Sequence, residues 1–585
     1  MNTAIIIVIG LILYAVFYMT HGKYLEKKVV KADPNRQTPA QRLYDGVDYV
    51  PANKYVLYGH HFASIAGAGP IVGPAIAMAW GWLPTLLWVW FGNVFVGVVH
   101  DYLALMSSVR YDGHTIAWIS GKLMSRRAFY AFNTYIWFAL ILVVAAFAFV
   151  ISALFTKVPG AGFASFVMIL LAPLIGYLMY KSPLGFKGGT VVGWILIALA
   201  IYGGYVVQAA GFSLDFNAWL VILLVYIIIA ASLPVWVLLQ PRDYMNAYIL
   251  WFSLALGGSA LIVVAAKGLG ALQFPAFTTF SANVVGGQPS PFWPTIPLIV
   301  ACGALSGFHS IVGSGTSSKQ LANEAHGLLV GYGGMLTEGF LSTLVIGSLA
   351  AFGFLAFEKA GLEAATLQQL HDPATFGAMY AAVANKLKWT VIPYSYAYAV
   401  EGAYGLPFDP VAIFATLWIT AFALTSLDTA TRLGRYAWQE LMEPLKKTAE
   451  GAYKVLANRW FASALIAVIG VLLAYTKQFL VIWPAFAGMN QLLSSLALMT
   501  IAVWVIKVQK TTGLGKGLTV APAIFMWITV TLALIWYLVV VIPALWAKNL
   551  VTAATVGAIT VIGVGLNLYL FAEWILALTR KEAGT

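Results

Sequence analysis

Residues 59–74 read GHHFASIAGAGPIVGP, at the head of an apolar run that is long enough to cross a bilayer. Three glycines and two prolines stand among the last eight of these residues. Glycine permits backbone conformations that are closed to other residues, and proline removes a hydrogen-bond donor. Such a break survives at membrane depth only where it is buried in protein or lines an aqueous cavity. The stretch predicts a broken helix over 62–82, with close packing through small residues as the alternative.

A second stretch has the same character. Residues 301–320 read ACGALSGFHSIVGSGTSSKQ, again a histidine beside a break rich in glycine and serine inside an apolar span, 295–315. In our topology 62–82 runs outward and 295–315 runs inward. Two broken helices of opposite direction, at corresponding places in two halves, predict an inverted-repeat secondary transporter with its site near the midplane.

Composition defines the class of protein. The chain is 61% hydrophobic and 9% charged, whereas soluble domains carry about 25% charged residues. Apolar stretches of about 20 residues recur along most of the length, as membrane helices require. We therefore predict an all-α polytopic membrane protein with about fifteen transmembrane helices. The net charge of +12 reflects orientation rather than nucleic-acid binding.

The basic loops set the predicted orientation. Segments 21–59, 107–129, 429–459 and 506–518 are basic and fall on one side, which is the cytoplasmic side by the positive-inside rule. The N-terminus is then outside and the C-terminus inside. We expect segment 358–408 on the outer side, either packed over the mouth or as an interfacial loop.

Four stretches resemble signature segments of the carbon starvation protein A (CstA) family. They are the two glycine-rich stretches above, SLDTATRLGRY at 426–436 and MNQLLSSLAL at 489–498. The resemblance covers about residues 50–500. It implies a bacterial inner-membrane transporter of the APC superfamily, with a leucine-transporter-like core of two inverted five-helix repeats. Family members are associated with peptide uptake during carbon starvation, a stress response, and in some cases with proton-coupled pyruvate uptake.

The expected division of the chain follows from this likeness. It comprises an extra N-terminal helix and basic cytoplasmic loop (1–58), a first inverted repeat (59–211), intervening helices (212–294), a second inverted repeat (295–505) and peripheral C-terminal helices (506–585).

Candidate substrate contacts lie at the two breaks and in the last signature. Half-helix N-termini offer unpaired N–H groups that favour a carboxylate, and hydroxyls and a protonated histidine can add to them. The candidates are Ser64, Gly67, Gly69, His309, Ser310, Ser314, Gly315, Thr316, Asn490 and Gln491.

Candidate groups for ion or proton coupling are the few ionisable and hydroxyl side chains inside predicted spans. A histidine beside a carboxylate can exchange a proton in the physiological range, and hard oxygen ligands suit Na⁺. The candidates are His61, His100, Asp101, His309, Glu338, Thr425, Ser426, Asp428 and Thr429. Asp428 has an alternative role, capping its helix and pairing with Arg432 four residues later.

Other functional classes have weaker support. The histidines could hold haem or a metal in a membrane protein, and a channel is a third possibility. None of these functions needs paired helix breaks. We expect no enzyme, no metal and no cofactor apart from H⁺ or Na⁺ as coupling ion. The single cysteine, Cys302, excludes an intramolecular disulfide and is expected to be a small packing residue. Expected partners are a peptide or small carboxylate and the bilayer, without nucleic acid.

Overall fold

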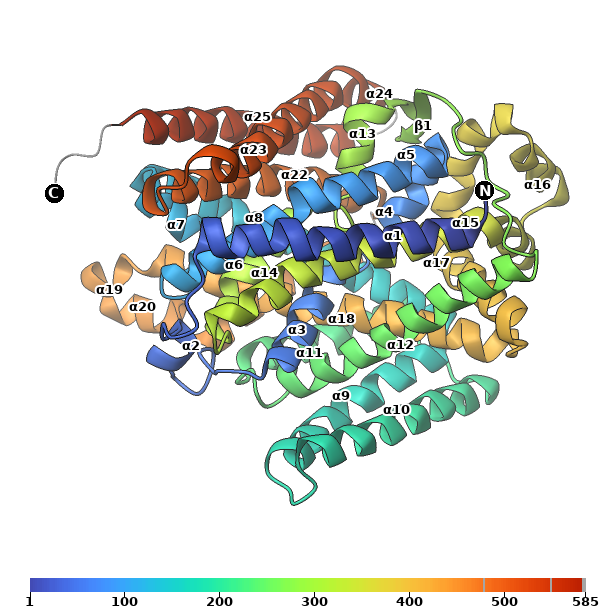
Figure 1. Cartoon of the computed structure of the whole chain (residues 1–585), viewed down its shortest axis with the longest axis horizontal. Coiled ribbons are helices and arrows are strands. Elements are labelled where there is room, and N and C mark those ends of the chain that lie inside the picture. The colour runs from blue at the N-terminus through green and yellow to red at the C-terminus, as the bar shows by residue number, and fades with distance from the viewer. Residues whose placement is uncertain (477–478, 548–549, 581–585) are drawn as a thin grey trace.

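Long helices run side by side through the computed structural model, which describes residues 1–476, 479–547 and 550–580 (Figure 1). The N-terminal part comprises α1 (Thr3–Phe17), α2 (Pro39–Arg42), α3 (Lys54–Ala66), α4 (Gly69–Ala77), α5 (Trp82–Leu87), α6 (Val98–Arg110), α7 (Ile116–Leu123), α8 (Arg126–Lys157), α9 (Pro159–Tyr180), α10 (Gly185–Ala209), α11 (Phe216–Ser232) and α12 (Leu239–Ala266). A π-helical segment, Trp88–Gly97, joins α5 to α6.

The second part begins with a short antiparallel hairpin whose register pairs Ser281 with Pro291. Its elements are β1 (Ser281–Val285), β2 (Gln288–Pro291), α13 (Phe292–Ile299), α14 (Gly307–Gly315), α15 (Gly334–Lys359), α16 (Ala364–His371), α17 (Pro373–Tyr404), α18 (Phe408–Met442), α19 (Leu445–Thr448), α20 (Glu450–Leu456), α21 (Arg459–Tyr475), α22 (Phe479–Val503), α23 (Gly513–Trp536), α24 (Ile542–Trp546) and α25 (Leu550–Thr579).

Within the described residues, eleven helices are long and apolar enough to cross a membrane, or up to thirteen if two bent pairs count as single spans. The multi-pass architecture is confirmed. The predicted count of about fifteen is larger because it includes α11, which has only 17 residues, and 295–315, which is divided between α13 and α14.

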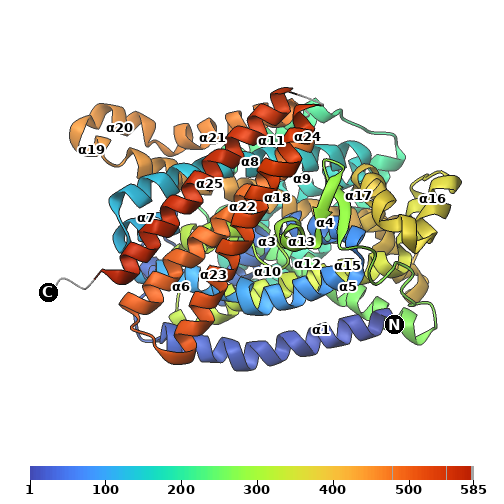
Figure 2. The same cartoon turned by 90° about the horizontal axis from the view of Figure 1, so that it is seen from above.

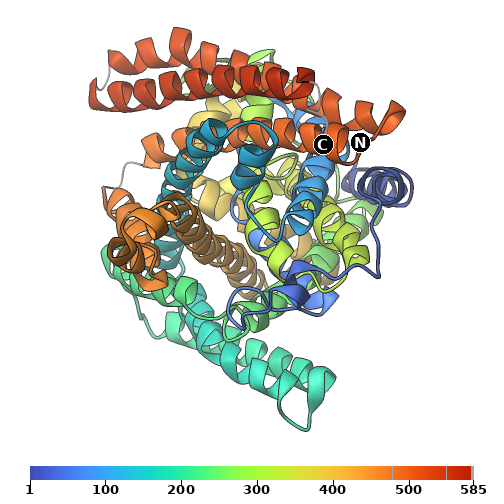
Figure 3. The same cartoon turned by 90° about the vertical axis from the view of Figure 1, so that its left-hand side faces the viewer.

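The helices divide into a core and two flanks. Figures 1 and 3 show α9 and α10 along one edge of the bundle and α23 and α25 along the opposite edge. Figure 2 shows α23 and α25 crossing the same face. Between the flanks, the helices α6, α15 and α18 are almost wholly buried. The start of α1 and the end of α25 lie at opposite ends of the bundle (Figure 1).

The first glycine-rich stretch is a broken helix. α3 ends at Ala66 and α4 begins at Gly69, with a bend of 40° between them. Gly67 has φ +34°, which side chains with a Cβ rarely adopt. A Cβ at Gly69 would overlap the Sγ atom of Cys302, so the first break packs directly against the second.

The second stretch is interrupted more widely. Residues 300–306 separate α13 from α14, and no regular helix connects them. The helix predicted over 295–315 is therefore two short helices and a buried irregular segment.

Segment 358–408, expected either to pack over the mouth or to form an interfacial loop, is mostly helical. It forms α16 and the 32-residue helix α17. The Tyr380 hydroxyl donates to Ala75 O in α4 at 2.7 Å, and the Tyr396 hydroxyl donates to Ser253 O in α12 at 2.9 Å. The mixed charge of the segment concealed a helix whose buried aromatic residues bind it to α4 and α12.

Candidate functional site

A buried group of charges, here called the Arg242 cluster, lies where α3, α11, α12 and α18 meet; its members are His60, Tyr226, Arg242, Asp243 and Asp428. Arg242 Nε donates to Asp243 Oδ1 at 2.9 Å, and its terminal nitrogens donate to both oxygens of Asp428 and to the Tyr226 hydroxyl. The Tyr226 hydroxyl donates in turn to Asp428. Arg242 is 2% exposed and both aspartates are 0% exposed.

Both ring nitrogens of His60 have polar partners. Its Nδ1 lies 2.6 Å from Asp243 Oδ2, a carboxylate oxygen that can only accept. Its Nε2 lies 3.1 Å from the Thr316 hydroxyl, which also lies within hydrogen-bond distance of Val312 O. These contacts are compatible with an imidazolium that donates from both nitrogens. In that form His60 and Arg242 would balance the charges of the two aspartates.

The Arg242 cluster borders the first break. Ser426, two residues before Asp428, donates to Ser64 O at 2.8 Å, and a Cβ at Gly67 would meet its Oγ. The Ser64 hydroxyl lies 3.1 Å from that of Thr429. These contacts tie α3 to α18 immediately before the break.

Asp428 pairs with Arg242 and not with Arg432, the partner considered from sequence. Arg432 instead contacts Asp48 at 2.9 Å and the carbonyls of Ala230 and Leu233. Thr425 accepts a hydrogen bond from Asn246 at 3.0 Å. These partners are at least 179 positions away in the chain, so a pattern of four-residue spacing cannot reveal them.

A second buried group, the His309 cluster, comprises His100, Asp101, Cys302, His309 and Glu338, all less than 5% exposed. Asp101 lies 2.7 Å from His100 Nδ1 and 2.8 Å from His309 Nδ1. His309 Nε2 lies 3.4 Å from Glu338 Oε2. The structure thus brings together four of the predicted coupling residues, on α6, α14 and α15, with Cys302 as a fifth member.

Two of the predicted substrate contacts, Asn490 and Gln491, form hydrogen bonds with residues at the second break. Asn490 Oδ1 accepts from Phe308 N at 2.9 Å and from the Ser306 hydroxyl at 3.1 Å. Gln491 Nε2 donates to Pro297 O at 2.7 Å and to Leu305 O at 3.2 Å. α22 therefore satisfies the backbone groups that the second break leaves without helical partners.

The remaining candidates lie on α14, just beyond it and on α3. Ser310 donates to Gly307 O, Ser314 accepts from Ile116 N, and His61 Nδ1 lies 2.8 Å from the Ser317 hydroxyl. A Cβ at Gly315 would overlap Leu433 of α18. These residues hold α14 and the turn after it against neighbouring elements in this conformation.

A third group joins Asp48 and Lys319, which lie outside the candidate membrane spans, to the C-terminal part of α18. In this Asp48 cluster, Arg435 and Arg432 contact the Asp48 carboxylate at 2.8 and 2.9 Å. Burial alone would raise the pKa of Asp48, but the two arginines outweigh it and lower that pKa. Burial lowers the pKa of Lys319 to about 8, against the opposing effect of Asp48. Lys319 Nζ lies 3.7 Å from the centre of the Tyr436 ring.

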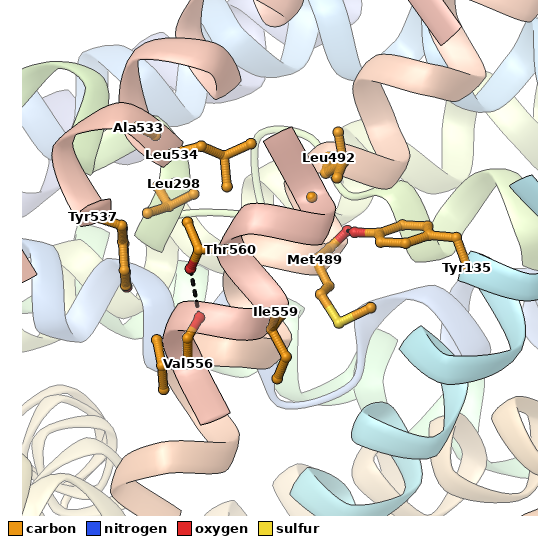
Figure 4. Close-up of a pocket in the computed structure, with 12 residues that line it drawn as sticks. Tyr135, Leu298, Met489, Leu492, Ala533, Leu534, Tyr537, Val556, Ile559 and Thr560 are labelled. Atoms are coloured by element: carbon orange, nitrogen blue, oxygen red, sulfur yellow. Dashed lines mark hydrogen bonds between the residues drawn. The ribbon is translucent and has the colours of Figure 1, made fainter. Parts of the chain in front are cut away.

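The cavities near the breaks are small. One, lined by Tyr135, Met489, Leu492 and mostly apolar neighbours, has a volume of about 30 Å³ (Figure 4). Another, beside Phe308 and Asn490, has about 10 Å³. The first can hold roughly one water molecule, so neither has room for a peptide in this conformation.

Sequence reasoning missed Arg242, Asp243 and Tyr226. In the sequence QPRDY (240–244) precedes an apolar run, but in the structure α12 begins at Leu239 and buries both charged side chains. An adjacent Arg and Asp directly before an apolar run was the available signal. His60 was not among the candidate site residues.

Comparisons with known proteins agree on one family. The model of the family described as carbon starvation protein CstA matches residues 2–533. The peptide transporter CstA of Bacillus subtilis is 32% identical over 537 residues, covering 87% of this chain and 86% of that protein. The peptide transporter CstA of Escherichia coli is 30% identical, covering 96% and 83%. The pyruvate/proton symporter BtsT of E. coli is 30% identical, covering 90% and 81%.

A solved manganese transporter of Eremococcus coleocola aligns with 92% of this chain and 99% of its own, at 12% identity and a TM-score of 0.44, a likeness too low to define the fold. The extent of the family match and the identity to the bacterial transporters are decisive. The chain belongs to the carbon starvation protein CstA family.

Proposed function

We propose that the protein is a secondary active transporter that takes up small carboxylates such as pyruvate together with protons, or short peptides. The observation that carries the proposal is the Arg242 cluster, in which a buried arginine is shared by two aspartates beside a broken helix. The names of the bacterial relatives support transport of this kind.

Charge balance explains why an anion would enter with a proton. We take His60 as an imidazolium, which makes the cluster neutral, and adding a buried unpaired charge is costly. A substrate carboxylate that replaces Asp428 on Arg242 leaves Asp428 without a cation, and a proton on Asp428 restores neutrality. One proton would therefore enter with each monocarboxylate.

A bound peptide can also leave the net charge of the Arg242 cluster unchanged. Its C-terminal carboxylate can bind Arg242 while its N-terminal ammonium pairs with the displaced Asp428. The same exchange of ion pairs would accommodate both substrate classes named for the relatives.

The side chains that contact His60 and Asp428 indicate which group accepts the proton. His60 is faced by Asp243 of α12 and Thr316, and Asp428 is faced by Arg242 of α12 and Tyr226 of α11. We propose Asp428 as the proton acceptor because the exchange of partners removes its only cation, whereas Asp243 keeps His60.

The leucine-transporter-like architecture is part of this proposal. The two breaks pack against each other at Gly69 and Cys302, as expected for corresponding helices of two inverted repeats. Alternating access would separate α3 and α14 from α12 and α18 and so open the Arg242 cluster. We propose the bacterial inner membrane as the site, with the basic loops in the cytoplasm.

Uptake by reconstituted liposomes tests the proposal. Labelled pyruvate and a labelled dipeptide are offered under an imposed proton gradient, an imposed sodium gradient or none. We expect the proton gradient alone to accelerate pyruvate uptake by the wild type. In Asp428→Asn the cluster has one net positive charge, so pyruvate should enter without a proton and the gradient should have no effect.

Asp215→Asn, at the start of α11 and outside the three clusters, is the matched control and should behave as the wild type. Gradient-driven uptake at the wild-type rate in Asp428→Asn would contradict the proposed role of Asp428. Absence of uptake of both substrates by the wild type would contradict the function itself.

A further inference from the structure

We propose that Cys302, His309 and Glu338 form a binding site for a divalent ion of the Zn²⁺ class. The Sγ atom, one ring nitrogen and a carboxylate oxygen of these residues all lie within 4.8 Å of one another, and all three side chains are buried. This site goes beyond the proposed transport reaction and revises the expectations that the chain binds no metal and that Cys302 only fills space.

The first argument is that acceptors face each other without a donor. His309 Nδ1 contacts the Asp101 carboxylate at 2.8 Å, so in the neutral ring the proton lies on Nδ1 and Nε2 presents a lone pair. Among the described residues, His309 Nε2 and both oxygens of Glu338 lack a hydrogen-bond partner. Burying a carboxylate and a lone pair 3.4 Å apart is unfavourable unless a proton or a metal cation lies between them.

The second argument is geometric. Two ligands of a tetrahedral zinc ion, each about 2.0–2.1 Å from the metal, lie about 3.3 Å apart. The observed separation of His309 Nε2 and Glu338 Oε2 is 3.4 Å. Closing the remaining distance to Cys302 needs only a small movement of side chains.

The third argument is the type of ligand. A thiolate, an imidazole and a carboxylate together favour Zn²⁺ over Mg²⁺ or Ca²⁺, which prefer oxygen alone. Asp101 supplies the outer carboxylate that typically orients a metal-binding histidine.

The position of the site gives it a consequence. Cys302 belongs to the second break and touches Gly69 of the first, His309 lies on α14 and Glu338 on α15. A bound ion would hold the second break to α15 and keep both breaks in the packed arrangement seen here. We therefore expect Zn²⁺ to raise the unfolding temperature of the protein.

Cobalt substitution tests the site directly. The full chain, purified without a histidine tag and freed of metal, is titrated with Co²⁺. We expect a near-ultraviolet thiolate-to-cobalt band that Zn²⁺ abolishes. Because the chain has one cysteine, the band can come only from Cys302. Cys302→Ser should lose it, and Asp101→Asn should weaken binding by about 10- to 100-fold.

Glu338→Gln should also weaken binding by at least about tenfold, whereas His326→Gln, a histidine outside the cluster, should leave it unchanged. Size-exclusion profiles confirm that each variant is folded. A wild-type protein without the cobalt band, or equal cobalt binding by wild type and Glu338→Gln, would overturn the proposal. Neither result depends on transport, so failure here is distinct from failure of the proposed function.

Discussion

The Arg242 and His309 clusters are both buried beside the breaks, yet they differ in how their buried charges are paired. In the Arg242 cluster two cations meet two carboxylates, and Asp428 and Asp243 each accept several hydrogen bonds. In the His309 cluster Glu338 and His309 Nε2 face each other without a donor. A balanced cluster must exchange partners to admit a ligand, whereas a cluster short of positive charge can bind a cation directly.

The largest expected effect comes from removing the cation of the balanced cluster. Arg242→Gln leaves Asp428 and Asp243 with His60 as their only cation, and breaking a buried pair in this way costs about 3–5 kcal/mol. Thermal unfolding of the purified protein measures the loss. The double variant Arg242→Gln/Asp428→Asn should be more stable than Arg242→Gln alone. Additive losses would show that the two residues do not form the pair.

Neutralising a charged side chain of the His309 cluster should raise the stability of the protein, whereas it lowers the stability in the Arg242 cluster. Glu338→Gln removes an unpaired buried charge and supplies an amide donor for His309 Nε2, so we expect the metal-free protein to gain up to about 1–3 kcal/mol. Unfolding in the presence of a chelator measures this. A loss as large as that of Arg242→Gln would mean that Glu338 has a partner and that the contrast between the clusters is wrong.

Crowding between the breaks should produce an intermediate effect. Gly69→Ala places a methyl group against Cys302, and overpacking of this kind costs about 1–3 kcal/mol. Uptake and cobalt binding should fall together, because the methyl group displaces Cys302. Gly451→Ala, where a Cβ meets open space, is the control. Unchanged cobalt binding in Gly69→Ala would separate the first break from the His309 cluster.

The smallest effect concerns Lys319 in the Asp48 cluster. Burial lowers its pKa to about 8, so holding it charged costs stability in the folded protein. The cost is fully present below pH 8 and disappears as the pH rises towards the ordinary lysine pKa. Lys319→Met should therefore stabilise the protein at pH 7 and have less effect at pH 9.5. Unfolding temperatures at the two pH values test this, and an effect that grows with pH would contradict it.

Local patterns predicted the breaks well. Glycine and proline in GAGPIVGP act on the backbone of their own segment, so the break at Gly67 follows from sequence alone. The wider interruption at 300–306 also lies inside the stretch chosen for its glycines and serines. The helix α17 was missed because its apolar and polar residues do not form separate faces, so the sequence shows no helical periodicity there.

The charge pairs could not be predicted in the same way. Asp428 and Arg242 lie 186 positions apart, and His60 and Asp243 lie 183 apart. Composition shows that such side chains need partners, but only the packing of α3, α12 and α18 shows which ones. The choice of His100, Asp101, His309 and Glu338 as coupling candidates rested on the rarity of ionisable residues in apolar spans, a signal that does not depend on the partner of each residue.

The number of protons that enter with each pyruvate molecule tests the central claim most directly. Liposomes containing the protein and an internal pH indicator receive pyruvate at zero membrane potential, with protein-free liposomes as the reference. The account predicts one proton per pyruvate and no net current in the wild type, and pyruvate entry without internal acidification in Asp428→Asn. A net current with wild-type uptake, or equal acidification in Asp428→Asn, would contradict the exchange of partners at Arg242.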